Sequence, residues 1–158
     1  MDPCYPERKK LNHSTPGWVE GPEYFITICC ENRQINSLCH PMIGQMILNS
    51  ASNLNSKGIW QCELLLLMPD HLHLLTSFSG KKSMEAVITL WKRWLVVHTR
   101  VKFQRGFFDH RIRSVYSSCQ KWAYINLNPV RRGLINDPLS WPYRWTQKDL
   151  NLPRHASP

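Results

Sequence analysis

The pattern of hydrophobic and polar positions predicts short strands alternating with helices. Apolar runs of strand length, rich in leucine, aromatic or β-branched residues, occupy residues 24–30, 59–67, 71–78 and 107–112. Apolar residues recur at approximately helical spacing over residues 42–56, 83–99 and 116–128. The order is strand, helix, strand, strand, helix, strand, helix, which is typical of a single α+β domain.

The ends of these elements carry their own signals. Ser83 is suited to cap the second helix, and Pro129 is expected to stop the third. Pro69 and Asp70 separate two apolar runs, so the flanking strands are expected to form a hairpin. The simplest layout is an antiparallel sheet of four to five strands with helices packed on one face. The proline-bearing tail is expected to wrap this domain as irregular structure.

The composition indicates a folded protein without a membrane segment. The chain has 158 residues, of which 42% are apolar, and this is enough to bury a core. No apolar run approaches the roughly 20 residues that span a bilayer. The start of the chain lacks the apolar stretch of a secretory signal, so we expect a cytoplasmic protein with no membrane partner. None of the six cysteines forms a C-x-x-C pair, which favours buried free thiols over a zinc ribbon.

The positive charge is unevenly placed along the chain. The formal net charge is +9, and residues 81–148 hold 14 Lys and Arg against three acidic residues. A surplus of this size favours polyanions, because cationic side chains release the counterions that surround phosphates. A nucleic acid is therefore the expected partner. The alternative is that the positive charge only keeps the protein soluble.

Two histidines share one face of the third predicted strand. His71 and His73 are two positions apart in the segment Met68-Pro-Asp-His-Leu-His-Leu-Leu75, and residues i and i+2 of a strand point the same way. Leu72 between them points to the opposite face, into the core. Two imidazoles in this arrangement can converge on one metal ion. Alone, the pair is also compatible with two structural histidines.

A tyrosine and an asparagine share one face of the last predicted helix. Tyr124 and Asn128 are four residues apart, which is about one helical turn. An amide oxygen is a suitable ligand for Mg²⁺ or Mn²⁺. A phenol becomes an oxygen nucleophile once its proton is lost or shared. On these residues alone, a half-buried tyrosine and a helix-terminal asparagine also explain the pair.

Together the two segments resemble the HUH-type tyrosine transposases, the IS200-like class, and most of all their REP-associated branch. Residues 68–75 (MPDHLHLL) are similar to the family signature MPNHVHLL, with Asp70 where Asn is common. Residues 124–134 (YINLNPVRRGL) resemble the signature YIxxNPVRAGL. Further matching segments occur in the same order and spacing at residues 21–27, 107–113 and 137–141. The resemblance extends from about Trp18 to Trp145, nearly the whole chain.

The resemblance implies a fold, an activity and a site. The fold would be the ferredoxin-like, RRM-like HUH fold, an α+β domain whose antiparallel sheet has four to five strands with helices packed on it. His71, His73 and Asn128 would bind a divalent metal, Mg²⁺ or Mn²⁺, and Tyr124 would be the nucleophile. The enzyme would cleave and rejoin hairpin-bearing single-stranded DNA through a 5′-phosphotyrosine intermediate, without a nucleotide cofactor. The REP-associated branch favours a monomer over a homodimer.

Several basic residues are candidates for holding the DNA backbone. These are Arg131 and Arg132 after the tyrosine helix, Lys81 and Lys82 after the histidine strand, and Arg8, Lys9 and Lys10 near the N-terminus. The chain accordingly divides into a basic arm (1–17), an HUH transposase domain (18–146) and a tail (147–158). Asp109 and His110, which the resemblance also covers, have either a structural role or a role in supporting a ligand.

Other functions remain open on the sequence alone. A non-catalytic, hairpin-binding relic of such a transposase would keep the fold, but all four expected site residues are present. An RNA-binding module with a four-stranded sheet would carry an aromatic signature that does not occur here. A metal hydrolase that uses water in place of Tyr124 would keep its activity when that phenol is removed.

Overall fold

The structure is a computed structural model that describes residues 21–148. Its elements, in chain order, are β1 (Glu23–Cys29), α1 (Pro41–Ser56), β2 (Trp60–Leu67), β3 (His71–Phe78), α2 (Met84–Thr99), β4 (Phe108–Ile112), α3 (Val115–Arg131), a short 3-10 helix η1 (Pro138–Ser140) and β5 (Arg144–Thr146). The strands form one sheet in the order β4-β1-β3-β2-β5, and every neighbouring pair is antiparallel. The predicted α+β class with a five-stranded antiparallel sheet is confirmed.

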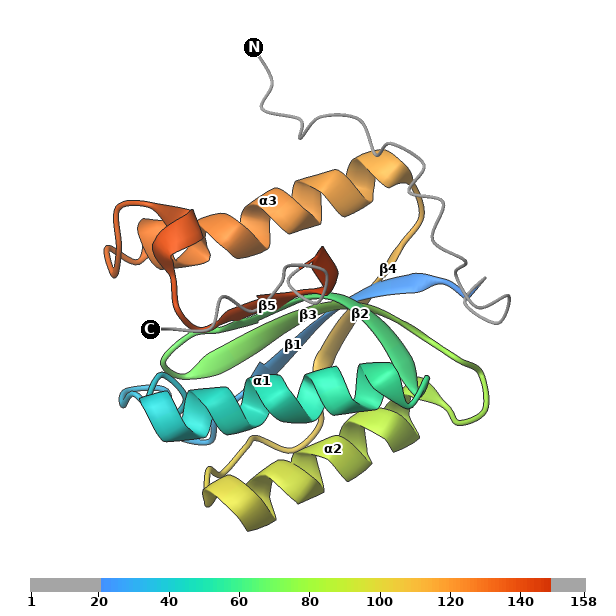
Figure 1. The fold of residues 1–158 in the computed structure, drawn as a ribbon, viewed down its shortest axis with the longest axis horizontal. Helices are drawn as coiled ribbons and strands as arrows, with labels where there is room; N and C mark the ends of the chain where they lie inside the picture. The colour runs from blue at the N-terminus through green and yellow to red at the C-terminus, as the bar shows by residue number, and fades with distance from the viewer. Residues whose placement is uncertain (1–20, 149–158) are drawn as a thin grey trace, which may run out of the picture.

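Helices cover both faces of this sheet. Helices α1 and α2 lie on one side and α3 lies on the other (Figure 1). The expectation that helices pack on one face only is therefore wrong. The physical reason lies in β2, where four consecutive leucines are fully buried: Leu65 and Leu67 face α1 and α2, whereas Leu64 and Leu66 face α3. Such an uninterrupted apolar run is typical of a strand covered on both sides.

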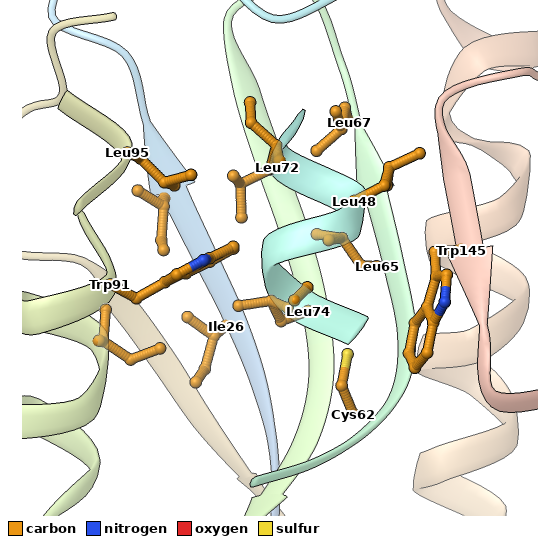
Figure 2. Packing of buried hydrophobic residues seen from close by; sticks show 14 of the residues in the cluster. Ile26, Leu48, Cys62, Leu65, Leu67, Leu72, Leu74, Trp91, Leu95 and Trp145 are labelled. Carbon is orange, nitrogen blue, oxygen red and sulfur yellow. The ribbon is translucent and has the colours of Figure 1, made fainter. Parts of the chain in front are cut away.

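The larger core fills the space between the sheet and the layer of α1 and α2 (Figure 2). Leu72 and Leu74 of β3 reach it, as the alternation along the strand requires. Two indoles hold the layers together: Trp60 donates to the carbonyl of Ala51 at 3.1 Å, and Trp91 donates to the hydroxyl of Ser50 at 2.9 Å. The buried indole N–H groups are thus satisfied by α1.

Helix α3 begins as the sequence indicates but runs further than predicted. The hydroxyl of its N-cap Ser114 accepts from the backbone N–H of Ser117 at 3.1 Å. Pro129 lies inside the helix, so the prediction that it stops the helix is wrong. A proline removes only its own N–H, and the next turn still forms: Arg132 donates to the carbonyl of Asn128 at 3.1 Å. The last turn therefore carries Asn128 and Arg131 on a continuous helix.

The proline-bearing segment after α3 also differs from the prediction, because it adds the edge strand β5 instead of irregular structure. Strand β5 pairs with β2, and just before it Leu67 donates to the backbone carbonyl of Tyr143 at 2.8 Å. Trp145 from this strand packs into the larger core (Figure 2). Three residues are too few to show the alternation of a strand, so the sequence pattern gives no signal here.

The described residues bear on several further expectations. Strands β2 and β3 form a hairpin around residues 68–70, and the hydroxyl of Ser83 caps α2 by accepting from Ala86 at 3.2 Å. The five cysteines between residues 21 and 148 are free thiols. No helix in this part of the chain has the length and apolarity to cross a bilayer. The basic arm (1–17) lies outside the described residues, and the predicted domain boundaries stay a prediction.

A close contact between α1 and the segment before β5 gives a test of this packing. A Cβ added at Gly44 would stand 2.6 Å from Cδ1 and 2.8 Å from Cε1 of Tyr143. We expect Gly44→Ala to lower the free energy of unfolding by about 1–2 kcal/mol, because overpacking outweighs the gain in helix propensity. Urea unfolding would measure this change. Asn53→Ala, at an exposed position of the same helix, should be neutral or slightly stabilising, and equal behaviour of the two variants would contradict the packing.

Candidate active site

The two histidines of β3 lie under α3. Both side chains are buried, and their ring centroids are 4.8 Å apart. Leu72 between them points into the opposite core, as predicted. Strand β3 is the central strand of the sheet, so β1 and β2 pair with its backbone on both sides and hold the two imidazoles in place.

The hydrogen bonds of the two rings determine which nitrogen carries the proton. The Nδ1 atom of His73 lies 2.9 Å from the hydroxyl of Thr27, and its Nε2 lies 2.9 Å from the side-chain nitrogen of Asn128. An amide N–H can only donate, so Nε2 of His73 accepts and Nδ1 carries the proton. The Nδ1 atom of His71 lies 2.7 Å from a carboxylate oxygen of Asp70 and must likewise donate. Each ring therefore keeps a lone pair on Nε2, which is the form that binds metals.

The electrostatics keep both rings neutral. Burial, with smaller contributions from the neighbouring His71, Arg33, Lys121 and Arg132, lowers the pKa of His73 to about 3. Burial also lowers the pKa of His71, although the Asp70 carboxylate opposes that shift. Both imidazoles are therefore uncharged at neutral pH, and each has an Nε2 lone pair for a metal ion.

Helix α3 brings the tyrosine and the asparagine to the same place. Asn128 is buried against His73, one turn after Tyr124. The ring of Tyr124 lies 5.9 Å from that of His73 and 6.0 Å from that of Phe25, and 41% of the residue is exposed. Phe25 stacks on His73 at 5.2 Å. The phenol therefore sits at the rim of the buried histidine pair, where a solvent-borne substrate can reach it.

Positive charges surround this rim. The Lys121 ammonium is 5.7 Å from the Tyr124 ring centroid, and the Arg131 guanidinium is 5.1 Å from it. A hollow of about 210 Å³ lies beside Asp70, the residue that contacts His71, and its lining includes Arg33 and Arg132. The positive charges of Lys121, Arg131 and Arg132 favour an anionic substrate such as a phosphodiester, whereas the charge of Arg33 is paired with Asp70.

The structure does not bring all predicted residues together. His71, His73, Tyr124 and Asn128 converge, and Arg131 and Arg132 lie beside them. Lys81 and Lys82 follow the far end of β3, beyond Phe78, so five residues of strand, roughly 16 Å, separate His73 from that end. Arg8, Lys9 and Lys10 lie outside the described residues. Asp109 and His110 are exposed on β4.

Four residues that orient the histidines were missed by the sequence reasoning. These are Phe25, Thr27, Arg33 and Asp70. Asp70 had a usable signal, since it directly precedes His71. Thr27 is found only through the register of the sheet, in which it stands opposite His73.

The side chains that converge here could together hold a divalent metal ion. The donor set consists of the two Nε2 lone pairs and the side-chain amide of Asn128, which presents its oxygen after a half-turn about Cβ–Cγ. Residues 21–148 contain no cluster of three His, Cys, Asp or Glu side chains suited to a metal, so the amide is needed as the third protein ligand.

The fold and the site together resemble one class of protein. An antiparallel sheet that presents two histidines from its central strand to a tyrosine-bearing helix is the arrangement expected of the HUH-type tyrosine transposases. No protein-family model matches the chain. Its sequence is nevertheless similar to the REP-associated tyrosine transposase of Escherichia coli (strain K12), at 20% identity over 141 residues that cover 84% of this chain and 81% of that protein. It is also 26% identical over 161 residues to an uncharacterized protein of Haemophilus influenzae, covering 77% of this chain and 85% of the other.

Solved structures share the fold. A REP-associated tyrosine transposase bound to a REP hairpin superposes with a TM-score of 0.71 at 21% identity, covering 87% of this chain and 83% of that one. A Deinococcus radiodurans protein described as a transposase gives a TM-score of 0.50 at 14% identity, covering 72% of this chain and 95% of the other. The resemblance to the tyrosine transposases is therefore confirmed.

The buried histidines make stability depend on pH. The pKa of His73 is about 3 in the folded protein and about 6.5 in the unfolded chain. The unfolded state therefore binds the extra proton between these values, so stability is full above about pH 6.5 and falls toward pH 3. One such group contributes a slope of about 1.4 kcal/mol per pH unit. Urea unfolding of metal-free protein between pH 7 and 5 should show this slope.

Variants separate this contribution from those of other groups. His73→Gln should reduce the slope of stability against pH, whereas His110→Gln, on the exposed strand β4, should leave it unchanged. If His73→Gln has the wild-type slope, the burial of a neutral imidazole is not what drives the pH dependence.

Proposed function

We propose that this protein cleaves and rejoins hairpin-bearing single-stranded DNA, with Tyr124 as nucleophile at a divalent metal site. The observation that carries the proposal is the convergence of a partly exposed phenol, two Nε2 lone pairs and an amide within one positively charged rim. A phenol nucleophile, neutral imidazole ligands and cationic groups for phosphate are the parts that phosphoryl transfer to tyrosine needs.

The chain's own residues account for the binding and the attack. Lys121 and Arg131 attract the phosphate to the Tyr124 ring. The phenol oxygen attacks phosphorus, its proton passes to solvent at the exposed rim, and the bond from phosphorus to the 3′-oxygen of the preceding nucleotide breaks. That oxygen leaves and takes up a proton. The 5′-phosphate remains covalently joined to Tyr124.

A metal held by His71, His73 and Asn128 would draw negative charge from the phosphate oxygens as the new bond forms. We propose Mg²⁺ or Mn²⁺ for this site, and the hard amide oxygen in the donor set supports that choice. Attack of another 3′-hydroxyl on the phosphotyrosine reverses the first step and joins strands. No nucleotide cofactor is required, because the phosphotyrosine retains the energy of the broken phosphodiester.

A hairpin is the proposed form of the DNA, and the support comes from the relatives. The solved REP-associated transposase is bound to a REP hairpin. We also propose that the protein acts as a monomer, because Tyr124 lies 5.9 Å from the ring of His73 in the same chain. The intact site favours an active enzyme over a non-catalytic relic.

Removal of the nucleophile gives the direct test of the reaction. We expect wild-type protein with Mn²⁺ to form a covalent adduct with a 3′-labelled hairpin taken from DNA flanking the gene. Tyr124→Phe should lower adduct formation by a factor on the order of 10³ or more. Denaturing gels would measure the adduct, and EDTA should abolish it.

Tyr116→Phe is the matched control, since this exposed tyrosine lies at the start of the same helix and away from the histidines. It should form the adduct at the wild-type level. Cleavage that persists in Tyr124→Phe would instead indicate a hydrolase that uses water. If the wild type slows the DNA in a native gel but does not cleave it, the protein is a non-catalytic hairpin-binding relic.

The basic residues beside the candidate site give a second test, in DNA binding. Arg132→Gln should weaken hairpin binding roughly threefold to tenfold and reduce the slope of log affinity against log salt by about 1, because one phosphate contact is lost. Fluorescence anisotropy at several salt concentrations would measure both. Arg93→Gln, an exposed residue of α2 on the other side of the sheet, should change neither. Equal effects of the two variants would mean that DNA binding is not focused on the α3 side.

A further inference from the structure

The two histidines are oriented by chemically different groups. His73 donates from Nδ1 to the neutral hydroxyl of Thr27 at 2.9 Å, whereas His71 donates from Nδ1 to the carboxylate of Asp70 at 2.7 Å. A hydroxyl orients a ring without adding charge, whereas a carboxylate also adds a negative charge. Both rings thus donate from Nδ1, but only His71 donates to a charged group.

Asp70 is fixed in the position that this contact requires. Its other carboxylate oxygen accepts from Nε of Arg33 at 2.7 Å, and its backbone carbonyl accepts from Cys30 at 2.9 Å. Arg33 comes from the loop between β1 and α1, so the carboxylate is held between two elements and is itself only 7% exposed. Both of its oxygens therefore have assigned partners, and it has little freedom to turn away from His71.

We propose that Asp70 is a positioning residue, held in place by Arg33, that keeps the proton of His71 on Nδ1 and strengthens the binding of a divalent metal at Nε2. This inference rests on the proposed function, because it concerns the metal site of that reaction. Asp70 touches neither metal nor DNA in this account and acts only through the ring of His71.

The physical argument has two parts. A neutral imidazole has two tautomers, and only the one with its proton on Nδ1 offers Nε2 to a metal. A carboxylate acceptor selects that tautomer and also makes the ring a stronger donor, since a charge-assisted hydrogen bond draws Nδ1–H toward the oxygen. Arg33 supports the arrangement by keeping the buried carboxylate ionised, which offsets the cost of its desolvation.

The tautomer can be measured without metal or activity. Long-range ¹H–¹⁵N correlation spectra of ¹⁵N-histidine-labelled, metal-free protein identify the protonated nitrogen of each ring. We expect Nδ1–H for both His71 and His73. Asp70→Ala should leave His71 without a single tautomer while His73 keeps its own, because Thr27 remains. Asp70→Asn should keep the tautomer, since the amide oxygen still accepts.

Metal binding measures the effect of the Asp70 charge. Mn²⁺ titrated into the full chain by calorimetry should bind about 10- to 100-fold more weakly to Asp70→Ala than to the wild type. Asp70→Asn should show a smaller loss, because it keeps the hydrogen bond and removes only the charge. Asp109→Asn, which removes an exposed carboxylate of β4, should bind as the wild type does. If Asp70→Ala does not fold, Asp70→Asn, which is nearly isosteric, carries the test.

The outcomes separate this inference from the proposed function. Protonation of His71 at Nε2 in the wild type would overturn it, as would Mn²⁺ affinities of folded Asp70 variants within about twofold of the wild-type value. In that second case the wild type still binds metal and the proposed function stands. If the wild type binds no Mn²⁺, the metal site of the proposed function fails, and the role assigned to Asp70 fails with it.

Discussion

Two imidazoles are buried on the α3 side of the central strand, and the register of that strand decides what surrounds them. Strand β3 is paired on both sides and covered on both faces, so its side chains alternate strictly between two layers. Leu72 and Leu74 fill the core under α1 and α2, and His71 and His73 face α3. A slip of one residue would exchange these sets and place the imidazoles among leucines. The large apolar core therefore fixes the site as firmly as it fixes the fold.

Buried polar rings are costly unless every nitrogen has a partner. Thr27 of β1 and Asn128 of α3 bond both nitrogens of His73, and Asp70 bonds Nδ1 of His71. Among the described residues, no buried side-chain nitrogen or oxygen lacks a hydrogen-bond partner. The contact between Asn128 and His73 also joins α3 to the sheet and sets Tyr124 beside the same ring. The same contact therefore packs the last helix on the sheet and assembles the candidate site.

The sequence predicted most of the fold and the centre of the site, and the misses have physical causes. The resemblance to the transposase family singled out His71, His73, Tyr124 and Asn128, and the strand and helix periods only placed each pair on a common face. The end of the last helix was predicted too early, at Pro129. A proline in the last turn removes a single hydrogen bond, so the helix continues past it. The contacts of Thr27 and Arg33 join segments far apart in the chain, and no local pattern encodes the pairing of β1 with β3.

The central claim is that His71, His73 and Asn128 form one metal site beside Tyr124. A crystal structure of the protein soaked with Mn²⁺, with anomalous data, tests it most directly. The account predicts one anomalous peak bonded to Nε2 of both histidines and to the amide oxygen of Asn128, with that amide turned relative to its present contact with His73. A peak at other residues, or no peak at the histidines, would contradict it.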